Sequence, residues 1–400
     1  MRLAYVCADP GVPVFGHKGC SIHVQEVIRA LRQHGVDVEL FATNLHGQRP
    51  ADLADLVVHA LPTLPKGDPA IREQAALAAN ISLFRALNQA GLFDALYERY
   101  SLWGYAGMRY AQSFRIPGLL EVNAPLIEEQ VAHRTLVHQQ VAETIASRVF
   151  GAASTLFAVS EAVEAYLQPF CAGHQTICVL PNGVDPQRFQ PAAQPRPDRP
   201  FTVGFVGSLK PWHGLPTLIT AFDLLYRRMP EARLMIIGDG PERPILEANV
   251  EGRELQEAVI FTGSLPPDQI PQMLHQIDVA VAPYAHGDQA YFSPLKVFEY
   301  MACGLPVVAG AVGQLKTIIQ HQQNGLLYPP GDAAMLSEWL WRLAHQPAFA
   351  VQIGTQARAT ILAKHTWEAV TATIVRHAKA ARPMPKTNFW SAFDPVGMMP

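Results

Sequence analysis

The sequence is poor in the features that would assign it to several common protein classes. Its five cysteines are odd in number and scattered, and no Cys-x-x-Cys occurs, which argues against a disulfide framework and against a zinc site. No apolar run approaches the roughly 18 residues that a membrane-spanning helix needs. The formal net charge is only -3 at pH 7 and the sequence has no Lys/Arg-rich run, so we expect no nucleic-acid partner.

The same absences favour a cytoplasmic protein. Scattered cysteines suit a reducing compartment. The first residues, MRLAYVCADPG, form too short an apolar run for a signal peptide and predict a first buried strand instead. Peripheral contact with the inner face of the membrane stays open.

What the sequence does contain is a regular alternation of short apolar runs and longer amphipathic segments. Up to about residue 180 the strand candidates are LAYVCA, VDVELFA, DLVVHAL, FDALYER, GLLEV, STLFAV and TICVL. After residue 200 the rhythm returns with FTVGFVG, ARLMIIG, AVIFTG, DVAVAPY, LPVVAG and NGLLY. This alternation predicts an α/β fold with parallel sheets that helices cover on both faces.

One proline-rich stretch, residues 186–200, interrupts the rhythm and is predicted to be a linker. It would separate a first domain, residues 1–185, from a second domain, residues 201–365. Because open parallel sheets bind ligands beyond the carboxyl ends of their strands, we expect the functional site in a cleft between these domains. The proline-rich tail, residues 382–400, has no periodicity and is predicted to be extended or disordered.

The segment YFSPLKVFEYMACGLPVVA, residues 291–309, predicts a loop, a helix and a strand. Ser293 is a candidate N-cap, and Pro294 suits the first helical position, where a missing N–H costs little. Gly304 is expected to end the helix, and Pro306 prevents its continuation.

This helix would offer a site for a nucleotide. Its first backbone N–H groups, at Leu295 and Lys296, lie at the positive end of the helix dipole, and the Lys296 side chain adds a full charge. One turn on, the Glu299 carboxylate suits a pair of vicinal hydroxyls. Phosphate and ribose together make a nucleotide, although an ordinary capped helix with a solvated Lys and Glu explains the same residues.

The segment SPLKVFEYMACGLPVVA resembles the nucleotide-sugar segment of the retaining GT-B glycosyltransferases, the glycogen-synthase-like "glycosyl transferases group 1". The resemblance implies two facing Rossmann-like domains and a final helix, residues 366–381, that returns to the first domain. It also implies that Glu299 binds the ribose. Tyr291 stands where these enzymes usually carry a first Glu beside the sugar, so this chain departs from the family pattern there.

The turn FVGSLKPWHG provides the second expected contact with phosphate. It follows a strand and enters a helix, so its backbone N–H groups are exposed, and Lys210 and His213 are expected to add positive charge. Ser208 and His213 replace the Arg and Lys that are usual in the family. We therefore expect Lys210 and Lys296 to hold the diphosphate. Because the chain has no Asp-x-Asp, we expect no metal requirement and no cofactor.

Several further contacts rest on the resemblance alone. Gly19, in the glycine loop of residues 11–24, would meet the donor phosphates, unless the loop is only a flexible turn. Main-chain groups near Leu265 would contact the base. Asn123 would contact the donor sugar where relatives often have His; an Asn that caps the next helix is the alternative.

Other polar residues follow predicted strands or occupy helices of the first domain. Glu98, Arg99, Glu121 and Asn123 are expected to line the cleft. Residues 126–149 form a mixed helical face that is either the acceptor side or simply solvated; it carries His133, Arg134 and His138. His17 and His23 receive no role. The turn IIGDGPER is predicted to have a structural role. The segment LPNGVDPQRF resembles the hinge motif of the family and is predicted to be the hinge between the domains.

The predicted function is transfer of a sugar, with retention, from a nucleotide-diphosphate sugar to a hydroxyl of a glycan, glycolipid or small molecule. Two alternatives remain. One is a nucleotide-sugar epimerase on the same fold, which would convert the donor without an acceptor. The other is a non-catalytic binding protein with a decayed site, which the replacements at Tyr291 and Ser208 would suit.

Overall fold

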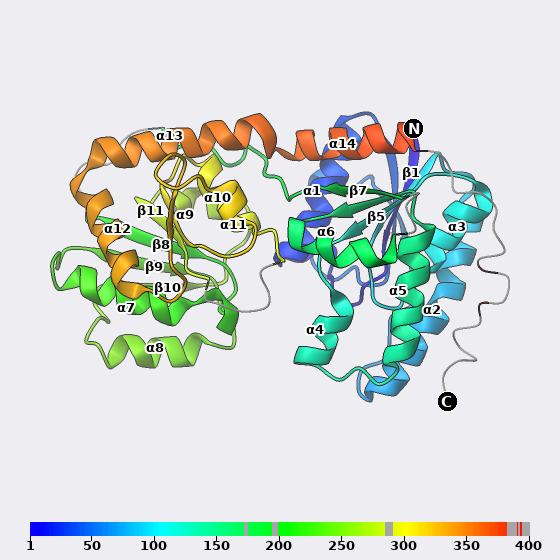
Figure 1. The fold of residues 1–400 in the computed structure, drawn as a ribbon, viewed down its shortest axis with the longest axis horizontal. Coiled ribbons are helices and arrows are strands. Elements are labelled where there is room, and N and C mark those ends of the chain that lie inside the picture. The colour runs from blue at the N-terminus through cyan, green and yellow to red at the C-terminus, as the bar shows by residue number, and fades with distance from the viewer. Residues whose placement is uncertain (172–174, 194–198, 285–290, 382–389, 391–392, 394–400) are drawn as a thin grey trace. The chain divides into compact units, whose positions relative to one another are not determined.

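The computed structural model describes the chain except residues 172–174, 194–198, 285–290, 382–389, 391–392 and 394–400. The chain forms two compact units (Figure 1). The first comprises Met1–Pro181 together with Trp367–Pro400, and the second comprises Asn182–Thr366. The predicted linker, residues 186–200, falls within the second unit, and part of it lies outside the described residues, as does most of the predicted tail.

The first unit is built on a seven-stranded sheet in the order β3-β2-β1-β4-β5-β6-β7. Its strands pair in parallel, as the apolar runs predicted. They are β1 (Arg2–Cys7), β2 (Asp37–Ala42), β3 (Val57–Ala60), β4 (Ala95–Arg99), β5 (Gly118–Val122), β6 (Thr155–Ala158) and β7 (Thr176–Val179). The central strands are buried, which explains why their sequences are almost continuously apolar.

Helices of the first unit connect these strands. They are α1 (Gly19–Gln33), α2 (Pro69–Ala90), α3 (Ala106–Phe114), α4 (Leu126–His133), α5 (Gln139–Ala152), α6 (Glu161–Leu167) and α14 (Trp367–Ala380), with short 3-10 turns η1 (Ala51–Leu53) and η2 (Gln168–Phe170). N-capping explains where two of these helices begin. The Asp68 carboxylate caps α2 by accepting from the backbone N–H of Ile71, and Ser160 Oγ caps α6 by accepting from that of Val163. The C-terminal helix α14 packs on α1 within this unit.

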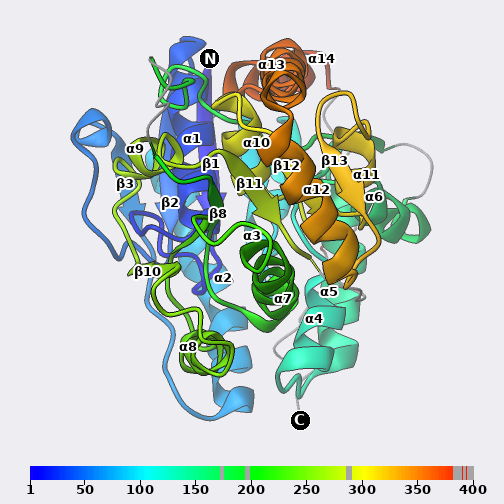
Figure 2. The same cartoon turned by 90° about the vertical axis from the view of Figure 1, so that its left-hand side faces the viewer.

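The second unit repeats the same arrangement with a six-stranded parallel sheet in the order β10-β9-β8-β11-β12-β13. The strands are β8 (Thr202–Val206), β9 (Arg233–Ile237), β10 (Val259–Gly263), β11 (Val279–Ala282), β12 (Val307–Gly310) and β13 (Leu326–Tyr328). The helices are α7 (Leu215–Tyr226), α8 (Arg243–Glu251), α9 (Ile270–Leu274), α10 (Leu295–Ala302), α11 (Leu315–Ile318), α12 (Ala333–His345) and α13 (Pro347–Lys364), with the 3-10 turn η3 (Pro211–His213). Figure 2 shows α7 and α12 side by side, and these helices pack against each other.

Two apolar cores in the second unit fix its sheet between helices. One core joins β8, β9 and β11 to α7 and α12, through side chains such as Phe222 and Leu340. The other joins the opposite face to α10 and α13, through side chains such as Phe298 and Ile361. Burial of apolar surface on both faces holds α10 beside the end of β8, which is where the candidate site lies.

Candidate functional site

The turn after β8 is shaped by close backbone packing. Gly207 has φ +146°, which side chains rarely tolerate, and its N–H donates to the carbonyl of Ile237. Gly238 and Gly240 pack against this turn: a Cβ on Gly238 would lie 2.0 Å from the Gly207 carbonyl oxygen, and one on Gly240 would lie 2.5 Å from that of Leu209. The glycines of IIGDGPER are therefore structural, as predicted, and they hold the turn in place.

The helix after the loop differs from the prediction at its start. Helix α10 begins at Leu295 with Pro294 as its N-cap and has no side-chain cap, so the expected cap by Ser293 is wrong. The Ser293 hydroxyl instead accepts a hydrogen bond of 3.0 Å from the backbone N–H of Asn182. The end of the helix is as predicted, since Gly304 has φ +69° and follows the last turn.

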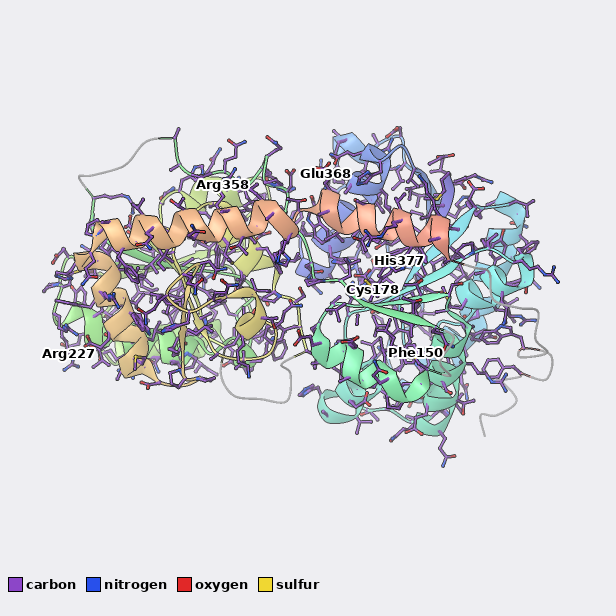
Figure 3. All side chains as sticks on the ribbon, turned by 45° about the horizontal axis from the view of Figure 1, so that its top comes forward. Phe150, Cys178, Arg227, Arg358, Glu368 and His377 are labelled. Carbon is purple, nitrogen blue, oxygen red and sulfur yellow. The ribbon has the colours of Figure 1, made fainter. Side chains whose placement is uncertain are left out.

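Asn182 and Arg358 fix the two ends of α10. The Asn182 side chain donates a second bond, 2.6 Å, from Nδ2 to the Ser293 carbonyl oxygen. At the other end, the guanidinium of Arg358 on α13, labelled in Figure 3, donates to the carbonyls of Ala302 and Phe189. The Arg358 contact satisfies a carbonyl of the last helical turn, which the helix cannot pair itself, and the Asn182 contact fastens the loop just before the helix, so α10 is held against the turn. The LPNGV segment thus has a positioning role that its sequence did not reveal.

Asn182→Ala is expected to lower the free energy of unfolding by about 1–3 kcal/mol, because the Ser293 carbonyl loses its side-chain donor. The midpoint of urea unfolding measures this loss. Asn88→Ala, an exposed position on α2, is the control and should change the midpoint little. Equal midpoints for the Asn182 variant and the wild type would show that the contact does not hold the loop.

Lys296, in the first turn of α10, turns its ammonium group toward Gly207. A Cβ on Gly207 would lie only 2.6 Å from Lys296 Nζ, so the glycine leaves room for this group. The ring centroids of Phe205 and Tyr284 lie 4.1 and 5.4 Å from Nζ. Nζ is buried without a hydrogen-bond partner among the described residues, although the residue as a whole is partly exposed. Burial lowers the pKa of Lys296 to about 7, against the opposing attraction of Glu299.

His213 lies beside the same ammonium group but carries no charge. Its Nδ1 donates to the Ser208 carbonyl, and its ring packs 5.5 Å from the Tyr284 ring. Burial, together with the charges of Lys296 and Lys210, lowers the pKa of His213 to about 3. The positive charge expected at His213 is therefore wrong at neutral pH, because a neutral imidazole costs less beside two lysines.

The structure brings Ser208, Lys210 and Lys296 together around this histidine. Ser208 is exposed and Lys210 partly exposed, with Lys210 Nζ 5.7 Å from the centroid of the exposed Trp212 ring. A buried cation without a hydrogen-bonded partner beside a second cation is an unfavourable arrangement until an anion is present. With the backbone N–H groups of Leu295 and Lys296 at the N-terminus of α10, it is suited to bind a phosphate or diphosphate.

The remaining predicted residues of the second unit lie on the elements around this cation pair. Leu295 begins α10, and Glu299 lies one turn beyond Lys296, close enough to act on its charge. Tyr291 is partly exposed in the loop before α10. Leu265 packs on the core that supports α10, after β10. Their contacts with a ligand stay predictions.

In the first unit, a polar cluster lies at the carboxyl ends of β4 and β5. Asn123 Nδ2 donates to Glu121 Oε1 over 2.8 Å, and Arg99 reaches to 3.9 Å from the same oxygen. His23, which received no role from the sequence, lies on α1 with Nε2 2.5 Å from Glu121 Oε1. Gly19 is the exposed first residue of the same helix.

Glu98 does not belong to this cluster, so its expected place in the cleft is wrong. The residue is 1% exposed, and a Cβ on Gly107 of α3 would lie 2.2 Å from its Oε2. Adjacent residues of a strand face opposite sides of the sheet, and Glu98 faces α3 whereas Arg99 faces Glu121. Burial raises the pKa of Glu98 to about 8, so it is neutral at pH 7.

The mixed helical face predicted on residues 126–149 does not include His138. His138 is buried, and both its backbone N–H and its Nδ1 contact Glu73 Oε2 at 2.9 and 2.7 Å. Glu73 Oε1 accepts from the neighbouring Val137 N–H over 2.9 Å. His138 therefore fastens the loop before α5 to α2 rather than facing solvent with His133 and Arg134.

Neither a membrane-spanning helix nor a metal centre occurs in the described part of the chain. No helix there is long and apolar enough to cross a membrane. No group of three or more His, Cys, Asp or Glu side chains in that part of the chain could hold a metal ion.

Comparison with family models matches both units. Residues 200–346 match the model described as "Glycosyl transferases group 1", and residues 18–183 match "Glycosyl transferase 4-like domain". Together the two models match more than three quarters of the chain.

Curated relatives agree with these matches. A D-inositol 3-phosphate glycosyltransferase of Acidothermus cellulolyticus is 26% identical over 370 residues, which are 84% of this chain and 79% of the relative. A 2-deoxystreptamine glucosyltransferase of Streptomyces kanamyceticus is 31% identical over 187 residues, 44% of this chain and 47% of the relative.

Solved structures show the fold. Sucrose-phosphate synthase from Thermosynechococcus elongatus has a TM-score of 0.76 at 24% identity, over 94% of this chain and 98% of its own. Anabaena HepE in complex with UDP and glucose has a TM-score of 0.73 at 19% identity, over 95% of this chain and 100% of its own. The predicted GT-B fold is thereby confirmed.

Proposed function

The chain belongs to the glycosyl transferases group 1, enzymes that transfer sugars, and we propose that its donor is a nucleotide-diphosphate sugar whose anomeric configuration is retained. The observation that carries the proposal is the buried ammonium of Lys296 at the Gly207 turn, without a hydrogen-bond partner among the described residues. The structures of HepE with UDP, glucose or UDP-glucose support a donor of this class.

In the proposed reaction, the bond between the anomeric carbon and the diphosphate oxygen breaks, and its electron pair stays on the diphosphate. Lys296, Lys210 and the first N–H groups of α10 stabilise the negative charge as it develops, which is usually the largest catalytic contribution. The acceptor oxygen bonds to the same face of the sugar, and its proton passes to the departing phosphate oxygen. This route assigns no protein side chain as a general base.

Other residues would recognise the rest of the donor. Glu299 would accept from the ribose hydroxyls, and main-chain groups near Leu265 would contact the base. Gly19 would allow the backbone to approach the phosphates, while Tyr291 and Asn123 would face the sugar. The diphosphate site would be lined by Ser208, His213, Ser293 and Leu295. The acceptor would be a hydroxyl of a glycan, glycolipid or small molecule; a cytoplasmic location and peripheral membrane contact stay predictions.

Thermal unfolding of the purified protein with UDP, GDP, ADP and their glucose conjugates tests the proposal. A ligand at 100 times its Kd stabilises the folded state by roughly 2.7 kcal/mol, which raises Tm by a degree or more. A response to one nucleotide identifies the donor class. If no nucleotide raises Tm, the site does not bind this donor class. Conversion of the free donor to another sugar nucleotide without an acceptor would instead indicate an epimerase.

Glu299→Ala is expected to weaken nucleotide binding about ten- to a hundredfold, because hydrogen bonds to a charged acceptor contribute about 1.5–3 kcal/mol. Isothermal titration with the responsive nucleoside diphosphate measures the change in Kd. Glu257→Ala, at an exposed position after α8, is the matched control. Unchanged affinity in the Glu299 variant, with wild-type Tm, would rule out the ribose contact.

We expect transfer to need no divalent metal, because Lys210 and Lys296 would supply the charge that a metal gives the leaving diphosphate in metal-dependent enzymes. The initial rate in millimolar EDTA should equal the rate in millimolar Mg²⁺ or Mn²⁺. A rate that disappears in EDTA and returns with Mn²⁺ would contradict this expectation.

A further inference from the structure

The carboxylate of Glu121 is the centre of a buried contact network in the first unit. It comes from β5, and its Oε1 lies 2.5 Å from His23 Nε2, 2.8 Å from Asn123 Nδ2 and 3.9 Å from an Arg99 nitrogen. The Glu121 side chain is almost fully buried, as is His23. A carboxylate with this many neighbours is held in one orientation, and its orientation in turn constrains theirs.

The charge of Glu121 decides how the Asn123 amide is turned. Burial alone would raise the pKa of Glu121, but His23, Arg99 and Asn123 together lower it to about 2. The group is therefore an ionised carboxylate at neutral pH, which accepts hydrogen bonds and cannot donate them. Only the NH₂ half of the Asn123 amide can face it, so the carbonyl half must face away.

One acceptor atom of this network is left over. Asn123 Oδ1 is buried, and it has no hydrogen-bond partner in the described part of the chain. Buried acceptors that have lost water without gaining a donor are unfavourable. Asn123 itself is partly exposed and directly follows β5, at the carboxyl end of a parallel sheet, where such sheets bind ligands.

We propose that Glu121 is a positioning residue that locks the Asn123 amide so that its carbonyl oxygen accepts a hydrogen bond from a hydroxyl of the donor sugar. The inference rests on the proposed function and makes it more specific. A fixed acceptor selects a group that donates: a hydroxyl satisfies it, whereas a fluorine or a hydrogen at the same carbon does not. The carboxylate, two residues away, acts through this amide and does not touch the sugar.

Binding of fluorinated donors tests the inference. The probes are the nucleoside diphosphate that raises Tm, its glucose conjugate, and the conjugates with fluorine in place of the 2-, 3-, 4- or 6-hydroxyl. In the wild type, fluorine at one position should raise Kd about tenfold, the loss of one hydrogen bond with a buried acceptor. Asn123→Ala should abolish that penalty, and Glu121→Gln should reduce it, because a Gln side chain lets the amide turn over.

The controls separate this inference from the proposed function. Affinity for the free nucleoside diphosphate should be unchanged in both variants, and Asn88→Ala should retain every wild-type value. A fluorine penalty that stays the same in Asn123→Ala overturns the inference alone, even if Glu121→Gln fails to fold. Absence of nucleotide binding by the wild type overturns the proposed function and this inference with it.

Discussion

Lys296→Ala is expected to lower kcat for sugar transfer by about a hundredfold, with a smaller effect on the KM for the donor. Removing one preorganised donor that stabilises developing charge typically costs about 3 kcal/mol of barrier. The Lys296 ammonium lies beside Phe205, Tyr284 and Gly207, and it has no hydrogen-bond partner among the described residues. It is therefore available to the charge that appears when the diphosphate departs.

The comparison for this variant is Lys316→Ala, which removes an exposed lysine of α11 in the same unit. Its kcat and KM should match the wild type. If Lys296→Ala raises KM and leaves kcat unchanged, Lys296 binds the donor equally in the ground and transition states and contributes nothing to the chemical step. Tm of the variant should be at or above the wild-type value, because an ammonium buried without a hydrogen-bonded partner is lost.

The strands and helices of the fold could be predicted because the sequence patterns that specify them are local. Parallel strands buried on both faces must be almost continuously apolar, as in LAYVCA and DVAVAPY, and these runs became β1 and β11. The end of α10 could be predicted in the same way. Gly304 adopts the left-handed conformation that commonly ends a helix, and glycine favours this conformation without any contact from distant residues. The family motif around Glu299 is equally local, which is why it pointed to the correct family.

The errors all concern contacts with distant residues. Serine is a common N-cap residue, and this predicted that Ser293 caps α10. Its hydroxyl instead accepts a hydrogen bond from the backbone N–H of Asn182, 111 residues earlier. The charge of His213 depends on burial beside two lysines, one of which comes from α10. Glu98 ends a strand like its neighbour Arg99, but α3 covers its side of the sheet. Strand alternation could have separated these two residues; the partners of Ser293 and His213 could not be read from the sequence.

The affinity for the donor is expected to fall about fiftyfold between pH 7 and pH 9. Because the pKa of Lys296 in the unliganded protein is about 7, the fraction of protein with a charged ammonium falls from about one half to about one hundredth over this range. A bound diphosphate favours the charged form and raises the pKa, so the complex stays protonated. Binding at pH 9 must therefore take up nearly one proton; Kd rises about fivefold from pH 7 to pH 8 and about ninefold more from pH 8 to pH 9.

Three described groups on the elements around Lys296 do not titrate in this range, which helps to assign the pH dependence to Lys296. The pKa of His213 is about 3, burial raises the pKa of Cys303 to about 12, and burial raises the pKa of Tyr284 still further. Titration calorimetry of the responsive nucleotide sugar at pH 9, in two buffers with different heats of ionisation, measures the proton uptake directly. Lys296→Met should bind the nucleotide sugar weakly at both pH values, with no proton uptake and no change of Kd with pH.

A wild-type affinity that is constant from pH 7 to pH 9 would mean that Lys296 is already charged in the free protein or does not contact the diphosphate. The rate measurements on Lys296→Ala distinguish these two cases, because a lysine that does not contact the diphosphate leaves both kcat and the donor KM unchanged.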